Sequence, residues 1–272
     1  MRHKINAMYF SATGTTKKVV SGIAEKIAQL ANGEMPVNTI NFTLPQVRKE
    51  PVSFTGDDLV IMGVPVIAGR VPNVLLKYLK SISGNGALAV AVVLYGNRNY
   101  DDALIELKDI LEGDGFKVIA GAAFIGEHSF SKILAKGRPD EKDMAIVEDF
   151  AQQIYTRITA QDHLPNVAVK GQKPYRDYYK PKDKNGNPVD MRKITPKTNS
   201  NCTKCLICVD LCPMGSIDRN DISKFNGICI RCCSCIKNCP VEARYFDDEN
   251  LIKHKNELEI EFADRKEPEL FI

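Results

Sequence analysis

Residues 5–30 read INAMYFSATGTTKKVVSGIAEKIAQL, and this stretch decides the fold of the first half of the chain. Its first six residues form an apolar run typical of a strand buried on both faces of a parallel sheet. Its last fourteen repeat apolar residues at helical spacing, and Asn32-Gly33 ends the predicted helix. The stretch is therefore expected to run from a strand, through a hydroxyl-rich turn, into a helix.

The same alternation continues to about residue 160. Further strands are expected at Val37–Phe42, Leu59–Val64, Ala87–Tyr95 and Phe116–Ile125, the first of them a weaker, alternating edge strand. Helices are expected near Asn73–Ile82, Asp101–Leu111 and Asp140–Ile158. Alternating strands and helices predict right-handed crossovers with helices on both faces of a sheet. We therefore predict an α/β fold with a doubly wound, five-stranded parallel sheet over residues 1–160, which would bind ligands at the carboxyl ends of its strands.

Length and charge limit the classes of function. The 272 residues predict roughly two domains. With 37 Lys and Arg against 34 Asp and Glu, the net charge of +3 gives no reason to expect a nucleic-acid partner. No apolar run reaches the roughly 18 residues of a membrane span. Residues Met1–Lys4 lead into a short apolar stretch without a cleavage site for a secretory signal, so we expect a cytoplasmic protein.

All nine cysteines lie between Cys202 and Cys239. They form the motif C-x2-C-x2-C-x3-C-P twice, and the second copy follows the first at a constant offset of 27 residues, as 229 − 202 shows. In a reducing compartment, such cysteines are interpreted as metal ligands or redox groups in preference to disulfides. A repeat of this kind predicts two similar units related by a pseudo-twofold axis. The eight repeated cysteines are Cys202, Cys205, Cys208, Cys212, Cys229, Cys232, Cys235 and Cys239.

This double motif resembles the bacterial ferredoxins that carry two [4Fe–4S] clusters. The resemblance implies that Cys202, Cys205, Cys208 and Cys239 bind one cluster, and that Cys229, Cys232, Cys235 and Cys212 bind the other. Two zinc sites are the alternative, but zinc would use pairs of C-x2-C and leaves the third cysteine and the proline without a role. Cys233 matches Leu206 of the first motif, so it is a small apolar filler, a replacement ligand or a regulatory thiol.

The turn Ser11–Thr16 after the first strand contains four hydroxyl residues and Gly14. Free N–H groups and the positive end of the helix dipole make such a turn an anion site, to which the hydroxyls add donors. The lysine of a nucleoside-triphosphate loop is missing. A plain Ser/Thr-rich helix cap is the alternative.

Residues 4–155 resemble flavodoxin, whose first loop reads [ST]-x-T-G-x-T and binds the phosphate of FMN. The resemblance implies that the flavin ring lies between the loops after the third and fourth strands, here 63–70 and 95–100. Tyr100 falls at the position of the flavin-stacking tyrosine, and because the chain has no tryptophan, Ile67 or Ala68 would cover the other face. The implied FMN-binding residues are Ser11, Thr13, Gly14, Thr15, Thr16, Pro65, Val66, Ile67, Ala68, Gly69, Tyr95, Gly96, Asn97, Arg98, Asn99 and Tyr100.

Charged residues near the implied ring have two interpretations each. Asp101 and Asp102 would make the flavin a stronger reductant, or they cap the next helix. Arg70 and Arg98 would stabilise a reduced anion, or they are surface residues. His128 follows the fifth strand and is either structural or, with Tyr95, a proton donor to a substrate.

Between the two cofactor regions, residues 161–200 lose their periodicity and contain five prolines, three tyrosines and an excess of basic residues. We interpret them as a linker pinned by its tyrosines, with a docking patch for an acidic partner as the alternative. Residues 201–247 would form the ferredoxin-like domain, and 248–272 an acidic tail.

The chain as a whole resembles the flavodoxin–ferredoxin fusions of anaerobes. It is expected to pass electrons between FMN, two [4Fe–4S] clusters and an external redox partner protein. One alternative is an FMN-dependent reductase of a small molecule that is fed by its own clusters. Another is a binding module in which the clusters are structural.

Overall fold

The computed structural model describes residues 4–33, 35–160 and 164–272. Residues Met1–His3, on which the expectation about a secretory signal rests, and the first residues of the expected linker, 161–163, lie outside the described part. Within that part, no helix is both long and apolar enough to cross a membrane.

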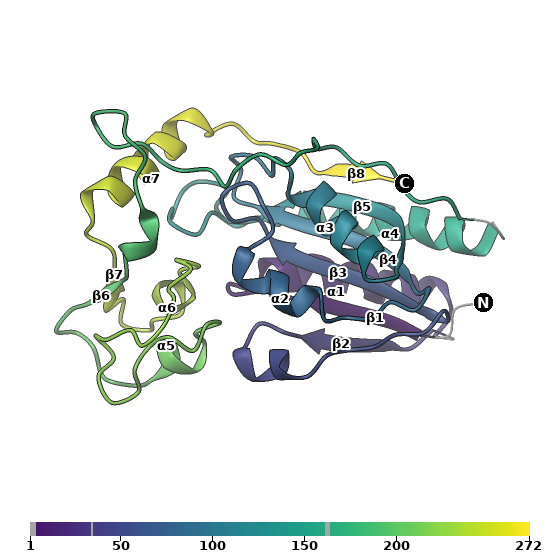
Figure 1. Cartoon of the computed structure of the whole chain (residues 1–272), viewed down its shortest axis with the longest axis horizontal. Helices are drawn as coiled ribbons and strands as arrows, with labels where there is room; N and C mark the ends of the chain where they lie inside the picture. The colour runs from purple at the N-terminus through teal and green to yellow at the C-terminus, as the bar shows by residue number, and fades with distance from the viewer. Residues whose placement is uncertain (1–3, 34, 161–163) are drawn as a thin grey trace.

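The five predicted strands form one parallel sheet with the order β2-β1-β3-β4-β5, which is the order of flavodoxin-like doubly wound folds (Figure 1). As predicted, the weakest strand, β2, lies at one edge. β3 and β4 are buried along almost their whole length, because helices cover both faces. The bounds are β1 Lys4–Tyr9, β2 Val37–Asn41, β3 Asp58–Pro65, β4 Leu88–Tyr95 and β5 Lys117–Ile125.

Two hydrophobic clusters lie on the two faces of this sheet. Alternate residues of β1 separate between them, so that Ile5 packs with α1 and α4, whereas Met8 packs with α2 and α3. The predicted helix near 73–82 is only a short 3-10 turn, η2, followed by one turn of α-helix, α2. Another 3-10 helix, η1, follows β2. The bounds are α1 Thr15–Leu30, η1 Pro45–Lys49, η2 Asn73–Leu75, α2 Leu76–Leu79, α3 Ala103–Gly113 and α4 Glu141–Ala160.

Gly63 of β3 allows α1 to approach the sheet closely. A Cβ atom at this position would lie 2.3 Å from Cγ2 of Val20 and 2.9 Å from Cγ2 of Thr16. We expect Gly63→Ala to lower the free energy of unfolding by about 1–3 kcal/mol, because the packed helix has to move away. Urea denaturation measures this change. Gly113→Ala, whose Cβ meets no atom within 4 Å, serves as the control and should cause no loss; equal losses in both variants would contradict the packing argument.

Residues 248–272 are not a separate tail, and the sheet has a sixth strand. Helix α7 (Glu249–Glu261) is followed by β8 (Glu269–Phe271), which pairs with β5 in the antiparallel direction. The expectation of five parallel strands is corrected here, because the edge of β5 is covered by a strand from the other end of the chain (Figure 1). The three residues ELF, set among charged residues, are too few to show an alternating pattern.

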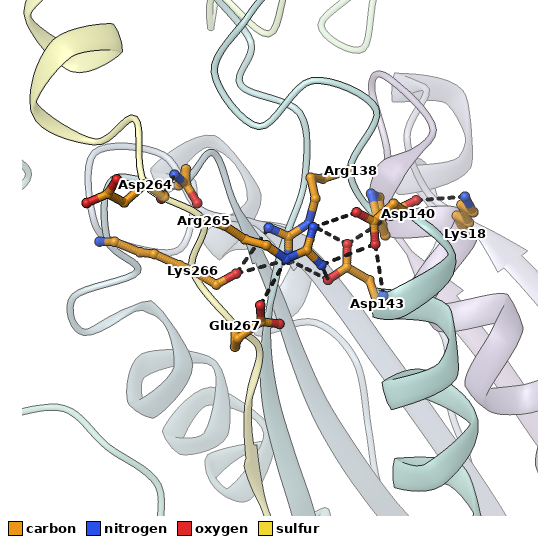
Figure 2. A network of polar contacts seen from close by, with 10 residues as sticks. Lys18, Arg138, Asp140, Asp143, Asp264, Arg265, Lys266 and Glu267 are labelled. Carbon is orange, nitrogen blue, oxygen red and sulfur yellow. Dashed lines mark hydrogen bonds and ion pairs between the residues drawn. The ribbon is translucent and has the colours of Figure 1, made fainter.

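A network of charged groups holds the segment before β8 in place (Figure 2). The buried Arg138 pairs with the fully buried Asp143 of α4 and also donates to the carbonyl oxygen of Lys266 at 3.0 Å. Arg265 pairs with Asp140 and lies 3.5 Å from a carboxylate oxygen of Asp143. These contacts join the loop between β5 and α4 to the C-terminal segment.

Residues 164–200, the connecting segment, lie against the first domain and then lead to the cysteine-rich unit (Figure 1). Tyr175 donates to Asp109, the Tyr178 hydroxyl donates to the carbonyl of Val71 at 2.8 Å, and the backbone N–H of Tyr179 donates to Ala68 at 2.9 Å. The tyrosines therefore pin the segment, as the sequence predicts. Several of its basic residues form ion pairs within the chain instead of a free basic patch; they include Lys170, Lys173, Arg176, Arg192 and Lys197.

The cysteine-rich unit lies beyond the carboxyl ends of the strands (Figure 1) and contains little regular structure. Its two one-turn helices begin 27 residues apart, at Ile207 and Ser234, and so repeat the offset of the cysteines. Its elements are α5 Ile207–Asp210, α6 Ser234–Lys237 and β7 Arg244–Tyr245. The connecting segment ends with η3 Met191–Lys193 and β6 Lys197–Thr198, and β6 pairs with β7 in the antiparallel direction.

Candidate functional site

A cavity opens at the carboxyl ends of β1, β3, β4 and β5. We call it the large cavity because 28 of the described residues line it. All four loops that follow these strands contribute to it, as expected for a ligand site on a doubly wound sheet. Twelve of the residues implied by the flavodoxin resemblance line it. They are Thr13, Thr15, Thr16, Pro65, Val66, Ile67, Ala68, Gly69, Tyr95, Gly96, Arg98 and Asn99.

The loop of Ser11–Thr16 joins β1 to the N-terminus of α1. The Ser11 hydroxyl accepts a hydrogen bond from the N–H of Lys17 at 3.0 Å, and Gly14 adopts a left-handed conformation directly before α1. A side chain at Gly14 would be strained at its φ of 90°. Ser11 is not among the residues that line the large cavity or the second cavity described below, whereas Gly14 lines that second cavity.

Tyr100 lies outside the large cavity, in contrast to the position implied for a flavin-stacking residue. The residue is only 2% exposed, its ring packs against Tyr95 with centroids 5.5 Å apart, and its hydroxyl donates to Glu269 at 2.9 Å. Burial and the carboxylate of Glu269 raise the pKa of Tyr100. The strand β8 thus supplies the partner of Tyr100 and holds the ring away from the ligand space.

Asn97 is also outside this cavity among the described residues. Its side-chain amide donates to the backbone carbonyls of Phe262 at 2.7 Å and Asp264 at 2.9 Å. It has a positive φ of 67°, which asparagine tolerates better than most residues. Asn97 therefore ties the loop after β4 to the C-terminal segment, a role that the sequence does not indicate.

The charged residues near this loop bind one another or the connecting segment. Asp102 is buried and accepts hydrogen bonds from the backbone of Gln172 at 3.0 Å and Arg176 at 2.7 Å, while its side chain makes no cap bond to α3. Arg98 pairs with Asp101. Arg70 pairs with Glu106 at 2.7 Å, and only 13% of the Arg70 side chain is exposed, so it is not a free surface residue.

Residues far away in the sequence complete the large cavity. Three come from the connecting segment, three from the second cysteine motif and two from α7. The aromatic residue among them, Tyr179, lies with its ring 4.6 Å from the guanidinium of Arg98 and 5.7 Å from the ring of His254. Sequence reasoning did not place these residues at the cavity, and they are Tyr179, Pro181, Met191, Ile230, Arg231, Cys232, His254 and Leu258.

His128 lines the cavity as a neutral side chain. Its pKa is lowered from 6.5 to about 4, first by burial and then by the neighbouring His254, Lys237 and Arg98. Its Nδ1 accepts a hydrogen bond from the N–H of Phe130 at 3.2 Å, which places the proton of the neutral ring on Nε2. Tyr95 also keeps its proton, because burial and then Glu269 raise its pKa to about 12.

The lowered pKa of His128 makes stability depend on pH. Between pH 6.5 and about 4 the unfolded chain binds a proton at this residue that the folded chain does not bind, so stability falls as the pH falls through this window. We expect the step from pH 7 to pH 5 to cost about 2 kcal/mol less in His128→Gln than in the wild type. Urea denaturation at both pH values measures this. Equal losses in the two proteins would contradict the assignment.

A second cavity, lined by nine of the described residues, adjoins the N-terminus of α1. It shares Thr13, Thr15 and Glu127 with the large cavity, so the two spaces meet at the hydroxyl-rich loop. Its lining contains three cationic side chains and one carboxylate. The residues are Thr13, Gly14, Thr15, Lys18, Glu127, Gly137, Arg138, Pro139 and Lys237.

The two cysteine motifs share one backbone geometry. Lys204 and Leu206 have φ angles of 56° and 62°, and their counterparts Arg231 and Cys233 have 55° and 60°. A left-handed conformation costs a non-glycine residue roughly 1–2 kcal/mol, so four such residues in register indicate a functional constraint. Backbones of this kind form concave nests of N–H groups, which bind phosphates and iron–sulfur clusters.

Backbone N–H groups of the unit already point at cysteine sulfurs. The N–H of Lys204 donates to Sγ of Cys202 at 3.4 Å. The N–H groups of Ser216 and Ala243, again 27 residues apart, donate to Sγ of Cys212 at 3.4 Å and Cys239 at 3.2 Å. Such hydrogen bonds stabilise thiolate ligands, so the donors suit a cluster.

The cysteines gather in two sets. Cys212, Cys229, Cys232 and Cys235 line one small cavity, so the last cysteine of the first motif lies with three of the second. Burial raises the pKa of Cys232 to about 12, and the other three thiols add to the increase. Burial likewise raises the pKa of Cys208, with further contributions from two neighbouring thiols, Cys202 and Cys205. The same fourfold combination around Cys212 is implied by the ferredoxin resemblance.

Cys233 is buried in the same unit, and its thiol pKa is raised well above the usual value, mainly by burial. It also lines the small cavity, as an apolar filler would. In the described part of the chain, no three Cys, His, Asp or Glu side chains form a group that could hold a metal ion.

Comparisons with known proteins were made for the sequence and for the structure. No family model and no curated protein matches the sequence. Among solved structures, the chain is similar to a flavodoxin from the domain Archaea, with 16% identity and a TM-score of 0.41 over 57% of this chain and 99% of that one. A Fusobacterium nucleatum flavodoxin bound to flavin mononucleotide has 19% identity and a TM-score of 0.38, over 56% of this chain and 96% of that one.

A third similar structure is the rubredoxin oxygen:oxidoreductase from the anaerobe Desulfovibrio gigas. It has 18% identity and a TM-score of 0.41, over 58% of this chain and 36% of that one.

Proposed function

We propose that this chain is an electron-transfer protein that binds FMN and two [4Fe–4S] clusters and exchanges electrons with an external redox protein. One observation carries the proposal: the large cavity is lined both by the loops of the parallel sheet and by Cys232 of the second cysteine motif. A ligand in this cavity would therefore lie next to a sulfur that is also a candidate cluster ligand. The short separation between the flavin and the cluster bound by Cys232 would favour direct electron exchange.

Different features of the chain support each group. The hydroxyl-rich loop and the second cavity at the N-terminus of α1 suit a phosphate, and the largely apolar lining between residues 65 and 69 suits a planar ring. The left-handed nests and the N–H groups directed at Cys202, Cys212 and Cys239 suit clusters. When bound, FMN exchanges one or two electrons and each cluster exchanges one, so the chain could convert between paired and single-electron carriers.

The two cysteine sets would have different positions in this electron path. The set around Cys212 adjoins the large cavity through Cys232, whereas Cys205 of the other set is exposed to solvent. We therefore expect electrons to pass from the flavin to the inner set and then to the outer set, or in reverse. The external partner would dock near Cys205, in a reducing compartment such as the cytoplasm.

The chain's own residues favour a carrier over a reductase with His128 or Tyr95 as proton donor. A general acid works best with a pKa near the working pH, whereas the pKa of His128 is about 4 and that of Tyr95 about 12. At neutral pH His128 is thus already deprotonated, and Tyr95 holds its proton tightly. In a carrier, both residues would shape the cavity and exclude water from it.

Anaerobic reconstitution followed by spectroelectrochemistry tests the proposal. We expect about one FMN and about eight iron atoms per chain. Reduction of the flavin should be followed by bleaching of the cluster absorbance in the same molecule. A chain that binds neither flavin nor iron, or whose flavin and clusters do not exchange electrons, would contradict the proposal. Turnover of a small oxidised substrate that is lost in His128→Ala would favour the reductase.

A further inference from the structure

We propose that Lys237 of the cysteine-rich unit completes the phosphate subsite of the first domain by neutralising Glu127. The phosphate monoester of the flavin would then bind tightly only when the cysteine-rich unit is docked. This inference rests on the proposed function, because it gives this chain's own residues a role toward the same FMN. Lys237 would be a positioning residue, since it acts through another side chain.

The contacts of Lys237 cross between the two units. It is the last residue of α6, between Cys235 and Cys239, yet its ammonium group pairs with the carboxylate of Glu127 and donates to the carbonyl of His128 at 2.9 Å. Glu127 and His128 belong to the loop after β5 of the first domain. The pair is partly shielded from solvent, with 22% of the Lys237 side chain and 31% of the Glu127 side chain exposed.

Glu127 is the unfavourable group in an otherwise cationic cavity. Among the described residues that line the second cavity, it is the only acidic side chain, and it also reaches the large cavity. The two other cations of the cavity already have partners: Lys18 donates to the carbonyl of Pro139 at 2.7 Å, and Arg138 pairs with Asp143. Without Lys237, the charge of Glu127 would face the phosphate without a neutralising partner.

This arrangement would couple binding of the phosphate to docking of the cysteine-rich unit. If Lys237 strengthens phosphate binding only in the docked state, then by reciprocity the bound phosphate must stabilise docking to the same extent. Loading of the flavin and the approach of Cys232 to the large cavity would thus favour one another. The coupling requires a phosphate, so a flavin without one should not show it.

The test measures binding of FMN and of riboflavin, which lacks the phosphate, by the quenching of flavin fluorescence in the full chain with its clusters. In Lys237→Ala, the dissociation constant of FMN should rise at least about tenfold and that of riboflavin less than about twofold. In Lys237→Ala/Glu127→Gln, the affinity for FMN should return to within about threefold of the wild type. Lys132→Ala is the matched control, because its 3.2 Å pair with Glu242 also joins the two units but is highly exposed, and neither residue lines either cavity.

Iron content is measured in each variant, because Lys237 lies between two candidate ligands. If Lys237→Ala loses iron, the single variant Glu127→Gln becomes the deciding test. It should tighten FMN binding and leave riboflavin binding unchanged. The inference is overturned if FMN and riboflavin weaken equally, if neither weakens, or if the double variant binds FMN as weakly as Lys237→Ala. A wild-type chain that binds neither flavin would instead contradict the proposed function.

Discussion

Replacing Cys232 with alanine is expected to remove about half of the iron from the chain and to stop electron exchange between the flavin and the cluster that remains. Cys232 lies with Cys212, Cys229 and Cys235 around one small cavity and also lines the large cavity. Its loss should therefore remove the cluster next to the flavin. Iron and sulfide content per chain measure the first effect, and anaerobic reduction of the remaining cluster through the flavin measures the second.

Two other cysteines provide matched controls. Cys233→Ala changes the neighbouring residue, which has no counterpart in the first motif, and should leave the iron content unchanged. Cys205→Ala should also remove about half of the iron, but the cluster next to the flavin should still be reduced, because Cys205 belongs to the outer, exposed set. Unchanged iron in Cys232→Ala, or identical electron transfer in the Cys232 and Cys205 variants, would contradict the proposed order of the centres.

Asp143→Ala is expected to lower the free energy of unfolding by about 3–5 kcal/mol, the usual cost of removing one partner from a buried ion pair. The Asp143 side chain is fully buried and pairs with Arg138, which is itself only 5% exposed (Figure 2). Its loss would leave a buried guanidinium without a counter-ion and weaken the attachment of the C-terminal segment. Urea denaturation measures the stability, and limited trypsin digestion at Arg265 and Lys266 measures the release of that segment.

Glu148→Ala on the same helix is the control. Glu148 pairs with Lys26 at 3.0 Å, but 60% of its side chain is exposed, so its loss should cost less than about 1 kcal/mol. It should not increase digestion at Arg265. If Asp143→Ala were no less stable than Glu148→Ala, the network in Figure 2 would not hold the C-terminal segment.

Much of the sheet could be predicted, because its strands carry local signals. The runs at Leu59–Val64 and Ala87–Tyr95 are apolar throughout because both faces are covered, and the hydroxyl-rich turn after β1 marks the crossover to α1. Short elements without such a signal could not be predicted. The strand β8 is three residues long and forms only because the edge of β5 is free to pair with it.

The residues of the candidate site likewise divide into those that a local sequence signal predicts and those that it does not. Loop residues such as Thr13 and Ala68 follow directly from the ends of their strands, and the structure places them at the large cavity. Tyr100 follows a strand in the same way, but its hydroxyl has a partner in Glu269, 169 residues away, and its ring is therefore directed elsewhere. Cys232 and Tyr179 reach the cavity from other parts of the chain.

By itself, the sequence determined the alternating strands and helices, the hydroxyl-rich turn and the duplicated cysteine motif, because each depends on residues close together along the chain. Only the tertiary structure decided which of these parts meet. It covers β5 with the end of the chain, turns Tyr100 away from the cavity, and brings Cys232 and Lys237 to the loops of the first domain. Packing and charge pairing over more than a hundred residues depend on the complete fold, and no local pattern records them.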